Sequence, residues 1–196
     1  MTDPVFSRRE AVTFTPDGSP RSYTIAPLTF RERQAFRAEL AREGGLYPPR
    51  VQLIAALRGA VQEIAPDNAP ALLADIDAAE ATPDDVGAQT RLASIEAIAA
   101  EVPIYAALLA ARERYLGTLP WVAARHALRG WDGPSLPPFR RERGSVPTDL
   151  LDSLPDAEIE AIGWKASALM QPNASAEGNS VAPSPSPEIP APTTEG

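Results

Sequence analysis

Side chains that could carry out chemistry are few in this chain. Its 196 residues include one histidine, His126, and no cysteine. These counts exclude a zinc site built from several histidines or from thiolates, and they exclude a cysteine nucleophile. His126 lies in the stretch WVAARHALRG, where no activating partner can be identified. We therefore interpret it as a structural histidine of the core or the surface.

Paired carboxylates are more frequent, but their spacing does not favour acid–base catalysis. Asp75 and Asp77, like Glu158 and Glu160, are two residues apart, so the two members of each pair lie on different faces of a helix. The sequence also lacks a phosphate-binding glycine loop and a nucleophile-elbow serine. We predict that the protein is not an enzyme and that it uses no metal and no cofactor.

Charge is unevenly distributed along the chain, which has a formal net charge of −8. Residues 63–101 contain nine acids and one arginine, whereas residues 112–144 contain seven arginines and three acids. The patch formed by Arg140, Arg141 and Arg143 could contact the phosphates of a nucleic acid. We favour a different interpretation, in which it meets the acidic 63–101 segment of the same chain or an acidic protein partner.

No segment of the sequence has the length and apolar character of a membrane span. The first ten residues, MTDPVFSRRE, contain no apolar core of a secretion signal. The absence of cysteine is typical of proteins in a reducing compartment. We therefore expect a cytoplasmic protein without a membrane partner.

Hydrophobic periodicity predicts a mainly α fold with a small β segment. Residues 11–28 alternate around the turn PDGSP, which predicts a hairpin packed on helices. Thr29 and Glu32 form the capping-box pattern of a helix start, and a glycine pair follows at 44–45. Further helices are predicted between Pro48 and Pro66, at 69–79, from Thr82 to Leu116 with a kink or break at Pro103, from Pro120 to Leu128, and twice within 148–170.

This pattern divides the chain into three parts. We expect an N-terminal hairpin segment at 1–28, packed on a compact helical domain at 29–171. Residues 172–196 contain three acids, no base and no aromatic residue, and are rich in proline and serine, which predicts a disordered tail. Within the helical domain, residues 131–147 are predicted to form a proline-rich loop that exposes Trp131 or lets it cover a groove.

Two stretches resemble tail assembly chaperones of long-tailed phages and prophages. YTIAPLTFRERQAFRAEL, at 23–40, is similar to the start of that family, where a short β segment leads through a pLT-x-x-E pattern into a charged helix. ALRGWDG followed by LPDAEIEAIGWKASALMQPNASAEGN is similar to its end. There, a helix (here Ile159–Met170) precedes an acid, an asparagine and a low-complexity tail (here Glu177, Asn179 and the residues beyond).

The resemblance implies a non-enzymatic chaperone in the host bacterial cytoplasm. Its partners would be the long helical tape measure protein, which it coats, and the tail tube subunits, which it recruits. A groove that receives an amphipathic helix is a common solution for such binding. We expect the partner-binding surface to include Phe36, Leu40, Arg33, Arg37, Trp131, Arg140, Arg141 and Arg143.

Several alternatives stay open at this point. Phe36 and Leu40 could instead be buried against Val51 and Leu57 as ordinary core residues. The protein could be a phage structural component such as a head–tail connector subunit, which acts as a ring, and a homo-oligomer is possible in either case. It could also be a nucleic-acid-binding packaging protein that uses the arginine patch, or an enzyme whose site the sequence does not show.

Overall fold

The computed structural model describes residues 10–171, and the expected tail at 172–196 and the first nine residues of the expected N-terminal segment lie outside the described residues. As predicted, the fold is mainly helical with a small sheet. The elements in chain order are β1 (Val12–Phe14), β2 (Ser22–Ile25), α1 (Phe30–Gly44), α2 (Arg50–Ile64), α3 (Ala69–Ala81), α4 (Val86–Ala99), α5 (Pro103–Ala127), β3 (Leu128–Asp132), α6 (Thr148–Leu151) and α7 (Asp156–Met170).

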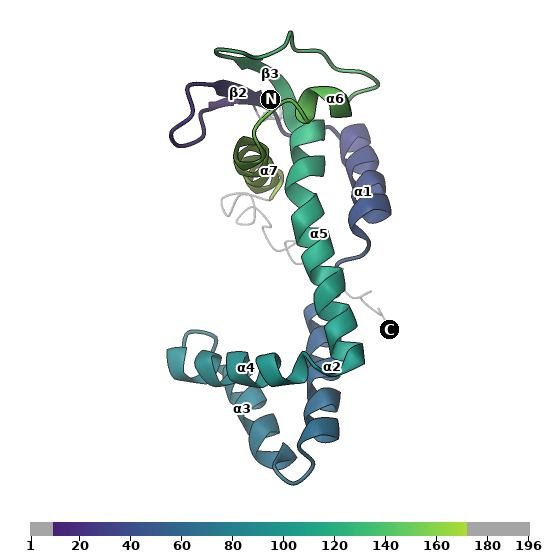
Figure 1. Ribbon diagram of the computed structural model, residues 1–196, viewed down its shortest axis with the longest axis vertical. Coiled ribbons are helices and arrows are strands. Elements are labelled where there is room, and N and C mark those ends of the chain that lie inside the picture. Colours follow the sequence, from purple (N-terminus) through teal and green to yellow (C-terminus); the bar gives the residue numbers. More distant parts are fainter. Residues whose placement is uncertain (1–9, 172–196) are drawn as a thin grey trace, which may run out of the picture.

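Helix α5 runs between two groups of elements (Figure 1). The sheet, α1, α6 and α7 gather around its C-terminal half, and α2, α3 and α4 gather around its N-terminal half. Each group has its own buried apolar cluster, represented by Tyr23 and Ile162 in the first and by Leu57 and Ile76 in the second. The helical region at 29–171 therefore has two cores that share one long helix.

The predicted hairpin is confirmed, and a third strand extends it. β2 pairs antiparallel with β1 and, on its other side, with β3, so that Tyr23 lies opposite Trp131. The prediction of an irregular loop is therefore wrong at 131–132, which belong to β3. A lone two-stranded hairpin is only marginally stable and leaves an unpaired edge, and pairing with β3 satisfies the backbone groups of that edge.

A carboxylate fastens the sheet to the last helix. Glu158, near the start of α7, accepts hydrogen bonds from the hydroxyls of Ser19 and Tyr23 and from the guanidinium of Arg21. Burial alone would raise the pKa of Glu158, but these donors outweigh it and lower that pKa. The hairpin is thus held by an ionised carboxylate as well as by apolar packing.

The start and end of α1 follow the sequence prediction. The Thr29 side chain accepts a hydrogen bond from the Glu32 backbone N–H at 3.3 Å, and a Glu32 carboxylate oxygen accepts one from the Thr29 backbone N–H at 2.9 Å. The capping box is therefore complete. At the other end, Gly45 has a φ of +75°, which glycine adopts without the strain of a side chain.

The break at Pro103 is confirmed, but one helix start is misplaced. α4 ends before Pro103, α5 begins with it, and the two helices are bent by 111°. The N-cap of α4 is Asp85, whose carboxylate accepts hydrogen bonds from two backbone N–H groups of the first turn. Thr82, predicted to be this cap, instead ends α3, where its hydroxyl donates to a backbone carbonyl of the preceding turn.

The prediction that a new helix begins at Pro120 is wrong, because α5 continues through Pro120 to Ala127. Proline removes one helical hydrogen bond but does not prevent continuation when the surroundings hold the helix in place. Here Gly163 of α7 lies directly against the Pro120 backbone, and a Cβ built at Gly163 would overlap its atoms. Close packing of α7 therefore accompanies the uninterrupted course of α5.

In the described part of the chain, no single helix is long and apolar enough to span a membrane. Only α4 and α5 taken together, across the bend between them, reach that length and apolar composition.

Replacing Gly163 by alanine tests the close contact between α7 and α5. The added methyl group meets the Pro120 backbone, which cannot move aside without distorting α5, so we expect a loss of about 1–3 kcal/mol in the free energy of unfolding. Urea denaturation followed by circular dichroism measures it. The matched control is Gly59→Ala in α2, where the space is open and alanine should stabilise by roughly 0.5–1 kcal/mol. Equal stability of the two variants would contradict the contact.

Candidate functional site

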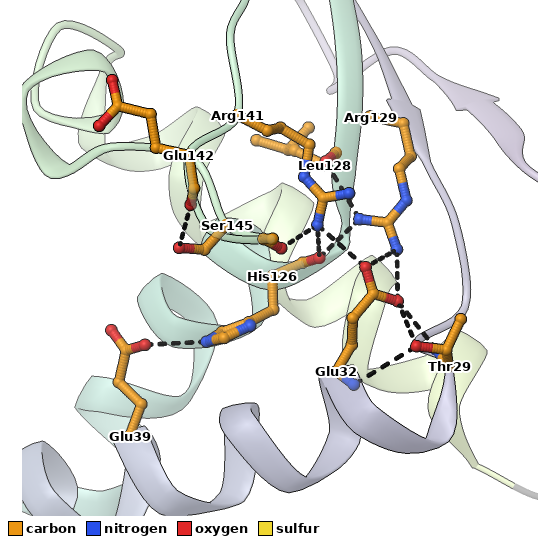
Figure 2. Close-up of polar contacts among 10 residues, drawn as sticks. Thr29, Glu32, Glu39, His126, Leu128, Arg129, Arg141, Glu142 and Ser145 are labelled. Atoms are coloured by element: carbon orange, nitrogen blue, oxygen red, sulfur yellow. Dashed lines mark hydrogen bonds and ion pairs between the residues drawn. The ribbon is translucent and has the colours of Figure 1, made fainter.

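Two carboxylates of α1, Glu32 and Glu39, hold this helix against α5, β3 and the loop that follows β3 (Figure 2). They are seven residues apart, so they lie about two turns from each other on one side of the helix. Each contacts two basic side chains from the region after residue 124. Together they fix the position of α1, from which several of the expected partner-binding residues extend.

Glu32 forms the more exposed of the two clusters. Both of its carboxylate oxygens lie 3.0 Å from Nη2 of Arg129, and Oε1 also accepts a hydrogen bond from Nη2 of Arg141 at 3.1 Å. The same two arginines donate to the backbone carbonyl of His126, at 2.7 and 3.1 Å. Figure 2 shows this convergence at the end of α5. One carboxylate thus connects the start of α1 to the α5–β3 junction.

The surroundings of Glu32 favour its ionised form. Burial alone would raise the pKa of Glu32, but the Thr29 backbone N–H, the guanidinium of Arg141, the Thr29 hydroxyl and the charge of Arg129 together lower it. Burial and the nearby charge of Arg141 lower the pKa of Arg129, and Glu32 opposes that change. Because a guanidinium stays protonated in proteins, the cluster combines one negative and two positive groups at neutral pH.

Glu39 forms the buried cluster, and it contains the single histidine. Its carboxylate lies 2.8 Å from Nε2 of His126 and also accepts a hydrogen bond from Arg125. Only 8% of Glu39 and 4% of His126 is exposed. The ring of Phe36 meets the imidazole edge-on, with 6.1 Å between centroids. The structure therefore places His126 inside the first core, as a structural histidine.

A carboxylate–imidazole pair is also the orienting half of a catalytic triad, which needs a nucleophile at the other ring nitrogen. That nitrogen, Nδ1 of His126, is buried and has no hydrogen-bond partner among the described residues. In the same part of the chain, no group of three or more histidine and carboxylate side chains is arranged to hold a metal ion. What this arrangement does chemically is to attach α1 to α5.

Three of the expected partner-binding residues line one groove, which we call the α1–α7 groove. Arg33, Phe36 and Arg37 contribute from α1, and the volume is about 210 Å³. Leu40, expected in the same surface, is only 3% exposed and lies in the first core. Phe36 is also largely buried there, as the core alternative expected, but the expected burial against Val51 and Leu57 is wrong. Val51 is exposed, and Leu57 belongs to the second core. The groove is completed by Leu119 of α5 and by Ser167, Met170 and Gln171 at the end of α7.

Trp131 lies away from this groove and is engaged within its own loop. Its indole N–H donates to the Pro137 carbonyl at 2.7 Å, and its ring meets Phe139 edge-on at 4.9 Å between centroids. The side chain is half-buried on β3 and packs on the first core. The expectation that Trp131 is exposed is therefore wrong, because strand pairing and the loop enclose it.

The arginine patch is paired within the chain, as one interpretation predicted, but with other acids. Arg140 bridges Glu142 at 3.0 Å and Asp149 at 2.8 Å, and Arg141 belongs to the Glu32 cluster. The partners named here come from outside the 63–101 segment, so the expected pairing with that segment is wrong for these two arginines. Arg143 is exposed, in a left-handed turn with φ of +50°.

Sequence reasoning missed the α5 and α7 walls of the groove. Leu119 and Met170 fit ordinary helical periodicity, which does not distinguish a groove wall from a core residue. Ser167 carries a sharper feature, because its hydroxyl oxygen is buried without a hydrogen-bond partner among the described residues. These side chains meet Arg33 and Phe36 only because α7 packs across α5. No local pattern in the sequence predicts that packing.

Comparison of the chain with protein-family models, with curated proteins and with solved structures found no match.

Substituting Glu39 by glutamine tests whether the buried cluster holds α1 in place. The change removes the charge between His126 and Arg125 and leaves the guanidinium without its counter-charge. We expect destabilisation by about 3 kcal/mol or more, measured by urea denaturation. Glu43→Gln on the exposed side of the same helix is the matched control, expected within about 0.5 kcal/mol of the wild type. A similar small effect for both variants would show that the cluster is not an anchor.

The Glu32 cluster should make stability depend on pH. Since the pKa of Glu32 is lower in the folded chain than the ordinary value of 4.5, its ionised form stabilises the fold above that value. This contribution is lost as the pH falls through the folded pKa. The wild type should therefore be more stable than Glu32→Gln at neutral pH, and the difference should shrink on acidification. A difference that stays constant into the acid range would contradict this assignment.

Proposed function

We propose that this protein is a non-enzymatic assembly chaperone of a long-tailed phage or prophage. In this proposal it binds the long, amphipathic helical tape measure protein and helps to recruit tail tube subunits. The proposal rests on the resemblance of residues 23–40 to that family. The observation that carries it further is that three residues of this stretch, Arg33, Phe36 and Arg37, line the α1–α7 groove.

The chemistry of the groove suits a side chain of a partner helix. Phe36, Leu119 and Met170 supply apolar surface, which we call the floor, and the exposed residues Arg33 and Arg37, which we call the rim, also line the groove. Its volume of about 210 Å³ is below the roughly 300–1,000 Å³ of typical small-molecule sites. An apolar anchor residue flanked by acids on an amphipathic helix would match both the floor and the rim.

The alternative of a nucleic-acid-binding packaging protein receives less support. Arg140 and Arg141 already have carboxylate partners within the chain, so binding phosphates would require breaking those pairs.

The test is co-expression with the long helical protein encoded nearby in the same genome. We expect the wild-type chain to keep that protein soluble and to co-elute with it. The double variant Arg33→Glu/Arg37→Glu should lose co-elution, because it reverses the charge of the rim without touching the core. The matched control is Arg31→Glu/Arg42→Glu, which changes two exposed arginines of α1 outside the groove by the same charge.

Circular dichroism should show the same helical content for both double variants. Equal co-elution of the two double variants would show that the arginines of the groove do not contribute to partner binding. Failure of the wild-type chain to keep the long helical protein soluble would contradict the chaperone proposal itself.

A further inference from the structure

The α1–α7 groove lies where the described chain ends. Gln171, the last described residue, is itself part of the groove lining, together with Met170. The segment 172–196 follows directly. An extended chain covers at most about 3.3–3.6 Å per residue, so six residues beyond Gln171 can span roughly 20 Å. The first part of this segment is therefore within reach of the whole groove.

The segment and the groove have complementary chemistry. Residues 172–196 carry three glutamates and no basic residue, and the first of these acids is Glu177. The rim of the groove carries Arg33 and Arg37, both of which are exposed. Four residues after Glu177 comes Val181, a β-branched apolar side chain. Glu177 and Val181 are thus close enough in the sequence for the acid to reach the arginine rim while the valine reaches the apolar floor.

We propose that residues 172–196 bind back into the α1–α7 groove of the same chain, with Glu177 at the arginine rim and Val181 over the apolar floor. Covalent attachment gives a short segment an effective concentration on the order of mM, so even weak contacts suffice for occupancy. The segment then acts as a built-in competitor, and any partner helix that uses this groove must displace it. The proposal concerns the isolated chain and does not depend on the identity of the partner.

Paramagnetic relaxation in the full-length chain tests this directly. Because the chain has no cysteine, Asn179→Cys creates a single attachment point for a nitroxide beside Glu177 and Val181. The reporters are methyl resonances of Leu119, which lines the groove, and of Ile76, which is buried in the second core around the other end of α5. We expect Leu119 to lose most of its intensity and Ile76 to keep it. Raising the salt from about 0.1 to 1 M, which shortens the Debye length from about 10 to 3 Å, should restore Leu119.

Charge-reversal variants separate docking from mere proximity to the end of α7. Arg33→Glu/Arg37→Glu should restore the Leu119 signal in the labelled chain, and the control Arg31→Glu/Arg42→Glu should leave it broadened. Equal broadening of Leu119 and Ile76, or an equal response to both double variants, would overturn the proposal. A second overturning result is broadening that arises between molecules, in a mixture of nitroxide-labelled and isotope-labelled chains. That result would make a second copy the occupant.

The result is independent of the co-expression experiment. If the groove is unoccupied and Arg33→Glu/Arg37→Glu loses co-elution, only the self-binding proposal is contradicted. If the groove is occupied but the chain does not keep the long helical protein soluble, only the chaperone proposal is contradicted.

Discussion

The buried Glu39 carboxylate is the interaction on which the groove depends. It lies between His126 and Arg125 and thereby fixes α1 on α5 at a single position. A buried ion pair adds little net stability compared with apolar residues of similar size. An arrangement of α1 that left the Glu39 carboxylate buried without its basic partners would, however, be strongly unfavourable. Since Phe36 packs against the same histidine, the register that satisfies Glu39 also places Phe36 in the lining of the groove.

The second wall of the groove depends on how closely α7 approaches α5. Gly163 permits contact with the backbone at Pro120, and this approach carries the end of α7 to Leu119 and to α1. The Glu158 cluster at the other end of α7 ties the same helix to the sheet. The groove is therefore built from rigid elements, while the second core, formed by α2, α3 and α4 around the start of α5, lies at the opposite end of α5 (Figure 1).

Local chemistry predicted local structure well in this chain. The capping box at Thr29, the break at Pro103 and the hairpin around PDGSP each rest on a few adjacent residues, and each is confirmed. The predictions failed where a distant element decided the outcome. β3 forms because β2 offers an edge, and α5 passes Pro120 in close contact with α7. Of the expected site residues on α1, Arg33, Phe36 and Arg37 line one groove, whereas Leu40 is buried in the first core. The partners of Trp131 and Arg141 depend on tertiary contacts that the sequence does not show.

The proposed function requires that a partner helix binds in the α1–α7 groove. Hydrogen–deuterium exchange of the full chain, alone and in complex with the co-expressed long helical protein, tests it most directly. Because a bound helix shields the groove lining, we expect added protection in α1 around Arg33 to Arg37 and in the last turn of α7. Protection confined to α2, α3 and α4, with unchanged exchange in α1 and α7, would contradict it.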